Sequence, residues 1–191
     1  MSKLFVLFLK YEPKDVIITI GGFLMGPMAV LISSTVVALI EMFTISDTGI
    51  IGCIMNFLST CSFAIPAALI YKHRHTMRGA ITGLLAGTAI MVCTMLLWNY
   101  LITPLYMTGT SRSDIAGMLL PVFLPFNLLK AGLNSSFILL LYKPLVVSLR
   151  KAGLLPATGS GAKSAKSGVM LFAALLLITC VLFVLVLRGI I

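Results

Sequence analysis

One stretch of the sequence reads IAGMLLPVFLPFNLLKAGLNSSFILLLY (residues 115–142) and contains a single charged residue, Lys130. A membrane-spanning helix needs about 20 apolar residues, so this stretch predicts such a helix. An ammonium group inside a membrane costs about 2.5–3.5 kcal/mol on insertion scales, and is tolerated where it faces protein or a ligand. Asn127 lies three positions earlier on the same helical face, and Asn99 ends the preceding apolar segment. These three side chains indicate a binding site for a polar solute.

The composition of the whole chain is that of an integral membrane protein. Of its 191 residues, 60% are hydrophobic and 10% are charged, whereas soluble domains are about 45–50% apolar and about 25% charged. The apolar runs have helical length, and the short alternating segments of a membrane barrel are absent. The predicted fold class is therefore an all-α, polytopic membrane helical bundle. The net charge of +9 does not predict nucleic-acid binding, because the basic residues cluster in short loops beside the membrane.

The membrane core is expected to span residues 15–150. Gly26-Pro27 interrupts its first apolar run, since proline lacks an N–H and disfavours helical geometry in the residue before it. We expect core helices over residues 15–26, 28–44, 51–71, 79–102 and 116–145, the last with an irregular start at Pro121 and Pro125. Residues 151–167 are rich in Gly, Ala and Ser and predict a flexible linker. Residues 168–191 predict an additional transmembrane helix.

The distribution of basic residues orients the chain. The loops at 72–78 and 143–151 are basic and are therefore expected on the cytoplasmic side. The loops at 44–51 and 107–114 then lie outside. Under this orientation Asn99 and Asn127 lie near the outer ends of their helices, so the predicted site opens towards the outside.

The polar side chains suit a flat heterocyclic ligand. An asparagine amide offers one acceptor and two donors, which complement the edge of a uracil-like ring, and a lysine can donate to a ring carbonyl. Apolar and aromatic walls from Met95, Phe123 and Phe126 would stack on such a ring. The alternative is that both amides bond between helices while Lys130 extends to the membrane surface, although Lys130 lies about 10–15 Å from the start of its helix.

Other features of the sequence have structural explanations. Gly79, Gly83 and Gly87 recur every four residues, a spacing that favours close helix packing, either within the protein or with a partner. The four cysteines lie in apolar runs without a CxxC pair, which predicts packing rather than disulfides or ligands. His73 and His75 have no nearby carboxylate or thiol, which disfavours a metal site.

Enzymatic function is not expected. There are five acidic residues, no acid–base pair stands out, and no HExxH, GxSxG or nucleotide-binding loop occurs. No cofactor is implied.

A set of ordered motifs matches a known transporter family. They are LKYEPKDV (9–16), GGFLMGP (21–27), PAALIYK (66–72), NYLITPLY (99–106) and LPFNLLKAG (124–132). In order and spacing these motifs resemble the membrane-embedded substrate-binding S-components of energy-coupling-factor (ECF) vitamin transporters, specifically the riboflavin type. The resemblance covers about residues 9–145.

The resemblance implies a ligand and a set of site residues. The family captures riboflavin near the outer face of the bacterial plasma membrane. By the motif match, the flavin should contact Asn99, Asn127 and Lys130. The loop with Tyr11 and Glu12 resembles the family's outer lid, and Tyr106 and Phe126, from the same motifs as the asparagines, complete the expected substrate-binding set: Asn99, Asn127, Lys130, Tyr11, Glu12, Tyr106 and Phe126.

The resemblance also implies partners for uptake, namely one coupling membrane subunit and two ATPase subunits. The chain departs from the family at both ends. Residues 1–14 resemble only a remnant of the first helix with the lid loop, and the linker and last helix are additions. Either an upstream segment is missing and the last helix is peripheral, or the last helix fills the vacant place. Two other functions stay open: an S-component for FMN or another vitamin-like solute, and a membrane scaffold protein.

Overall fold

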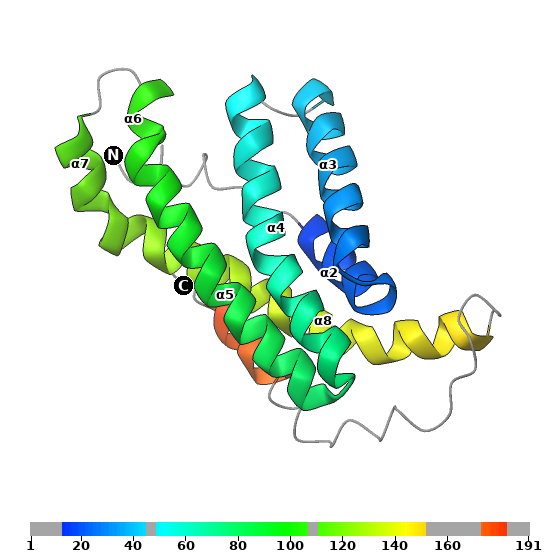
Figure 1. Ribbon diagram of the computed structural model, residues 1–191. Coiled ribbons are helices and arrows are strands. Elements are labelled where there is room, and N and C mark those ends of the chain that lie inside the picture. The colour runs from blue at the N-terminus through cyan, green and yellow to red at the C-terminus, as the bar shows by residue number, and fades with distance from the viewer. Residues whose placement is uncertain (1–12, 45–48, 107–110, 152–172, 183–191) are drawn as a thin grey trace.

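The computed structural model describes residues 13–44, 49–106, 111–151 and 173–182. Every regular element within these ranges is helical, which confirms the predicted all-α fold class (Figure 1). The elements are α2 (Lys14–Met25), α3 (Pro27–Thr44), α4 (Gly49–Arg74), α5 (Met77–Leu101), α6 (Thr103–Tyr106), α7 (Arg112–Met118), the π-helix η1 (Leu119–Phe123) and α8 (Leu124–Lys151). In Figure 1, α3, α4 and α5 stand side by side, and α8 passes behind α5 towards α2.

Four helical segments in the described part of the chain are long and apolar enough to cross a membrane. They are Pro27–Thr44, Gly49–Arg74, Met77–Leu105 and Arg112–Tyr142. Large apolar side chains cover their outward faces; Phe43, for example, is 81% exposed and Leu85 is 65% exposed. Such surfaces suit contact with lipid, in agreement with a multi-pass arrangement.

The chain turns sharply between α2 and α3, as the Gly26-Pro27 pair predicts. Gly26 has φ 92° and ψ 177°, a backbone region that is open essentially only to glycine. Its N–H donates to the carbonyl of Gly22 (2.8 Å), and Pro27 begins α3. The two predicted helices are therefore confirmed. Helix α2 begins and ends one residue earlier than predicted, and α3 begins one residue earlier and ends at Thr44 as predicted.

The glycine repeat packs α5 closely against α4. A Cβ atom added to Gly83 would lie 2.8 Å from the carbonyl oxygen of Ala67, and one added to Gly87 would lie 2.2 Å from that of Phe63. Both distances are far below normal contact, so these positions require glycine. Of the two interpretations of the repeat, packing within the protein is the one that the structure shows for Gly83 and Gly87.

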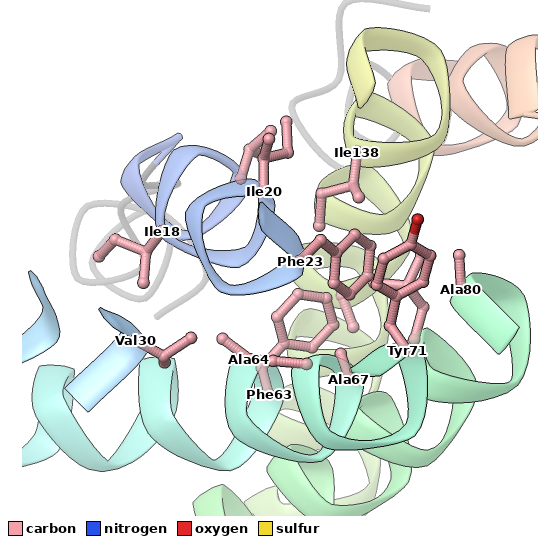
Figure 2. Packing of buried hydrophobic residues seen from close by; sticks show 14 of the residues in the cluster. Ile18, Ile20, Phe23, Val30, Phe63, Ala64, Ala67, Tyr71, Ala80 and Ile138 are labelled. Carbon is pink, nitrogen blue, oxygen red and sulfur yellow. The ribbon is translucent and has the colours of Figure 1, made fainter. Parts of the chain in front are cut away.

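Aliphatic, aromatic and small side chains form the core around α2, α4 and α8 (Figure 2). Ala64 and Ala67 of α4 are fully buried, which lets neighbouring helices approach α4. Phe23 of α2 stacks on Tyr71 of α4 with ring centroids 4.5 Å apart. The Tyr71 hydroxyl is hydrogen-bonded to the hydroxyl of Tyr142 on α8. The core therefore fixes α2 to both longer helices.

The predicted helix over 116–145 contains an irregular segment near its start. It begins earlier, in α7, where Ser111 and Asp114 form a reciprocal capping box. The π-helix η1 follows and contains Pro121, and α8 then starts with Pro125 in its first turn. Pro125 lacks an N–H, so the regular hydrogen-bond ladder cannot continue through this region. The structure confirms one helix with an irregular entry at these prolines: α7, η1 and α8 follow one another without a break, and Arg112–Tyr142 forms one apolar spanning segment.

Several sequence predictions concern the two ends of the chain. The remnant and lid loop predicted for residues 1–14 lie outside the described residues except for 13 and 14, and the linker is outside except for residue 151. Of the additional helix, the described part is Ala173–Leu182. One face of this helix packs on the bundle: Ala173 is fully buried in the core, and the Cys180 sulfur lies beside Gly132 of α8.

Candidate functional site

The intramembrane lysine is held by a buried carboxylate. Lys130 lies on α8 and is 7% exposed, so its side chain does not extend to the membrane surface. Its Nζ atom lies 3.4 Å from Oδ2 of Asp15, which is in the first turn of α2 and 1% exposed. A buried charge requires a partner of opposite sign, and Asp15 provides one.

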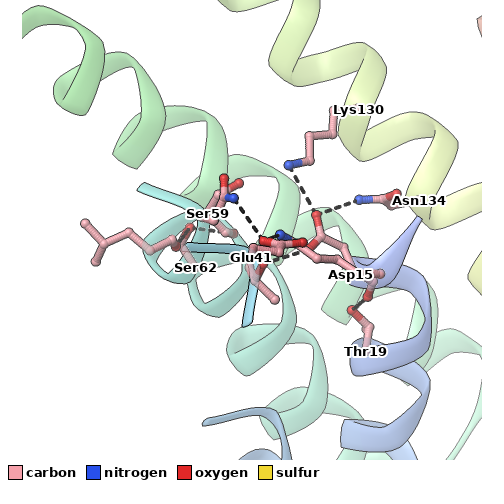
Figure 3. Close-up of polar contacts among 11 residues, drawn as sticks. Asp15, Thr19, Glu41, Ser59, Ser62, Lys130 and Asn134 are labelled. Carbon is pink, nitrogen blue, oxygen red and sulfur yellow. Dashed lines mark hydrogen bonds and ion pairs between the residues drawn. The ribbon is translucent and has the colours of Figure 1, made fainter. Parts of the chain in front are cut away.

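Two neutral side chains hold the Asp15 carboxylate in place. The Thr60 hydroxyl of α4 donates to Oδ1 (2.7 Å), and the Asn134 amide of α8 donates to Oδ2 (3.3 Å). We call Asp15, Thr60, Lys130 and Asn134 the Asp15 cluster; Figure 3 shows Lys130 and Asn134 converging on the carboxylate. Thr60 and Asn134 are both buried. The cluster therefore connects α2, α4 and α8 through one carboxylate.

Sequence reasoning missed Asp15 as a member of the site. It counted the five acidic residues and found no acid–base pair, because Asp15 and Lys130 belong to helices that are distant in the chain. A usable signal was present: an acid at the start of an apolar segment and a lone cation within another are each costly alone in a membrane. The expectation that these two buried charges pair with each other would have predicted the contact between Asp15 and Lys130.

Asn99 is buried on α5 and makes its hydrogen bonds locally. It is 7% exposed, its Nδ2 donates to the carbonyl of Met95 (2.7 Å), and its Oδ1 accepts from the Thr103 hydroxyl (3.0 Å). Neither of these bonds runs to another transmembrane helix. One of the two amide N–H groups is used by the bond to Met95, so the side chain retains donor capacity for a ligand.

Asn127 is bonded in the same way on α8. It is 3% exposed, and its Nδ2 donates to the carbonyl of Phe123, the last residue of η1 (2.8 Å). The alternative in which the two asparagines join helices finds no support in these bonds. Asn127 lies one helical turn before Lys130 on α8, and α5, which carries Asn99, packs against both η1 and α8. The structure thus places the three side chains on elements in mutual contact.

The other predicted site residues are less fully described. Phe126 is partly buried on α8, and Phe123, in the preceding η1, is buried. Tyr106 is the last residue of α6, but its side chain lies outside the described part. Tyr11 and Glu12 also lie outside the described residues.

A second polar cluster lies next to the first in sequence. Glu41 of α3 accepts hydrogen bonds from the Lys14 ammonium and from the Asn56 amide of α4, the latter at 3.0 Å. The side chains of Lys14 and Glu41 are 14% and 17% exposed, so this pair is less buried than Asp15 and Lys130. Lys14 and Asp15 are neighbours, so the start of α2 joins α3 through one residue and α8 through the next.

Comparisons with known proteins agree with this architecture. A family model described as "ECF transporter, substrate-specific component" matches residues 2–142. The riboflavin transporter RibU of Staphylococcus aureus (strain TCH60) is 31% identical over 150 residues, covering 75% of this chain and 78% of the relative. The riboflavin transporter FmnP of Bacillus subtilis (strain 168) is 28% identical over 156 residues, covering 76% and 82%.

A solved structure described as "Structure and mechanism of the S component of a bacterial ECF transporter" has the same fold. It superimposes with a TM-score of 0.61 at 31% sequence identity, covering 75% of this chain and 81% of the other. The apolar spanning helices, the buried polar site and the family match over residues 2–142 lead to one conclusion. This chain belongs to the substrate-specific components of ECF transporters.

Proposed function

We propose that this chain captures riboflavin from the extracellular side of the cell membrane for ATP-driven uptake. The observation that carries the proposal is the buried Lys130, with Asn127 one turn away on α8 and Asn99 on the adjoining α5. Placing charged and strongly polar side chains inside a membrane costs free energy, so such residues usually mark binding sites for solutes. The two relatives named as riboflavin transporters support the choice of ligand.

The chemistry of the site complements an isoalloxazine ring. The pyrimidine edge of that ring alternates carbonyl acceptors with an N–H donor, which an asparagine amide can match. The Lys130 ammonium would donate to a ring carbonyl or ligand hydroxyl. Phe126 would contribute an apolar wall, and Tyr11, Glu12 and Tyr106 would cover the ligand from the outer side, as the family motifs imply. This is a binding and transport function rather than catalysis.

Two alternatives differ in the observations that favour them. FMN is the closer one, because the Bacillus relative is named FmnP although it is described as a riboflavin transporter. A membrane scaffold would need an exposed docking surface of small residues. Gly83 and Gly87 instead pack against α4, so of the two features on which that alternative relied, the glycine repeat and the extra C-terminal helix, the first is used within the protein at these positions.

Uptake is proposed to require one coupling subunit and two ATPase subunits of an ECF module. Cells that express the chain with these partners should accumulate riboflavin, whereas cells expressing the chain alone or the partners alone should not. Uptake of radiolabelled riboflavin in a host without its own riboflavin importer measures this. Concentrative uptake by the chain alone, in proteoliposomes energised by a proton gradient, would contradict the proposal, as would no uptake in the presence of all subunits.

A further inference from the structure

The charge of Lys130 is balanced within the protein. Its ammonium and the Asp15 carboxylate are 3.4 Å apart, and both side chains are almost fully buried. The pair is formally neutral, and its ammonium is the group that we expect to contact the ligand. A solute entering beside Lys130 therefore meets a hydrogen-bond donor whose positive charge is already offset.

The surroundings of Asp15 supply hydrogen-bond donors to its carboxylate. A carboxylate accepts hydrogen bonds and cannot donate one, and Thr60 and Asn134 both direct donors at it. The carboxylate also lies at the N-terminal end of α2, where the helix dipole stabilises a negative charge. Donors from Thr60, Asn134 and Lys130, together with the helix end, therefore surround the Asp15 carboxylate.

We infer that Asp15 is a specificity-determining residue that makes the site select an uncharged flavin over its phosphorylated form. The inference rests on the proposed function. By neutralising Lys130, Asp15 removes the attraction that a bare buried cation would exert on a phosphate monoester. The ammonium remains able to donate a hydrogen bond to either flavin, so the carboxylate affects selection through charge.

The size of the effect follows from the electrostatics of a partly dry site. Two unit charges about 10 Å apart in a medium of effective dielectric constant about 20 interact strongly enough to change affinity about tenfold, and screening by salt reduces the larger effect of a doubly charged ligand towards a similar size. Removing the Asp15 charge should thus favour FMN, which carries about two negative charges, over riboflavin. The ratio of the FMN dissociation constant to the riboflavin dissociation constant isolates this effect, because the two ligands share the same ring and ribityl chain.

The test measures this ratio by fluorescence titration of purified, ligand-stripped protein in detergent. Asp15→Asn should lower the ratio about tenfold, which corresponds to about 1.4 kcal/mol. Glu41→Gln is the matched control: it removes one carboxylate from the neighbouring Lys14 pair, which does not include Lys130. The ratio for Glu41→Gln should stay within about threefold of that of the wild type.

Two further variants keep the test valid if Asp15→Asn does not fold. Lys130→Gln, which leaves Asp15 charged, should raise the ratio about tenfold. The double variant Asp15→Asn/Lys130→Gln restores neutrality and should return the ratio to that of the wild type.

The outcomes separate the inference from the proposed function. If the wild type binds both flavins but Asp15→Asn weakens them by the same factor, Asp15 only supports the fold and the inference is wrong. An equal fall of the ratio in Glu41→Gln would assign the effect to the general charge of the protein and would also overturn it. If folded wild-type protein binds neither flavin, the proposed function fails and the inference fails with it.

Discussion

Replacing Lys130 with methionine should weaken riboflavin binding by more than about tenfold and lower the free energy of unfolding by about 3–5 kcal/mol. Binding falls because the site loses a buried donor. Stability falls because the Asp15 carboxylate, 1% exposed, is left without its cation. Calorimetric titration and thermal unfolding of the same purified sample measure the two effects.

A double variant separates the two effects of Lys130→Met. Adding Asp15→Asn removes the unpaired charge, so most of the lost stability should return while flavin binding stays weak. Cys61→Ala is the control, because Cys61 is buried on α4 but is not a hydrogen-bond or ion-pair partner of Asp15; it should leave binding within about threefold. Unchanged stability in Lys130→Met would contradict the buried ion pair.

Gly87→Ala should destabilise the bundle by about 3 kcal/mol, because the added methyl group would lie 2.2 Å from the backbone carbonyl oxygen of Phe63. The neighbour is backbone and cannot rotate away, so α4 and α5 must separate. That separation would weaken the van der Waals contacts along the whole interface between the two helices. Thermal unfolding in detergent, in the absence of ligand, measures the loss.

Gly117→Ala is the matched control for this substitution. Gly117 also lies in a helix, α7, but a Cβ atom there would meet nothing within 4 Å. Alanine should therefore be neutral or slightly stabilising, since it favours a helix by up to about 1 kcal/mol over glycine. Equal losses at both positions would show that glycine itself, rather than the α4–α5 contact, determines stability.

Local signals account for the parts of the fold that the sequence predicts well. The turn at Gly26-Pro27 depends on the backbone preferences of two adjacent residues, and the α4–α5 contact depends on a short repeat of glycines. Hydrophobic length marks the spanning helices in the same way. The π-helix was not predicted because proline indicates an interruption without specifying which hydrogen-bond pattern replaces the regular one.

The candidate site depends on contacts between distant parts of the chain. Motif resemblance and the cost of burying polar groups identified Asn99, Asn127 and Lys130, and all three are buried. The partner of Lys130 could not be assigned from helical spacing, because Asp15 lies on a helix that is distant in the chain. Asn134 likewise reaches Asp15 across 119 positions. The asparagines were expected to face a ligand or another helix, whereas in the structure the amide of each donates to a carbonyl four positions earlier in the chain. The acceptor of each amide depends on the rotation of the side chain, which sequence position does not determine.

Isothermal titration of ligand-stripped protein with riboflavin tests the central claim most directly. A largely enclosed site with several directional hydrogen bonds should give a dissociation constant below about 1 μM, which corresponds to a binding free energy of about 8 kcal/mol or more. The sample must first be shown to be folded, for example by a cooperative thermal transition. If this chain captures riboflavin, binding should be submicromolar with a stoichiometry of one riboflavin per chain; no binding by folded, ligand-free protein would contradict the proposed function.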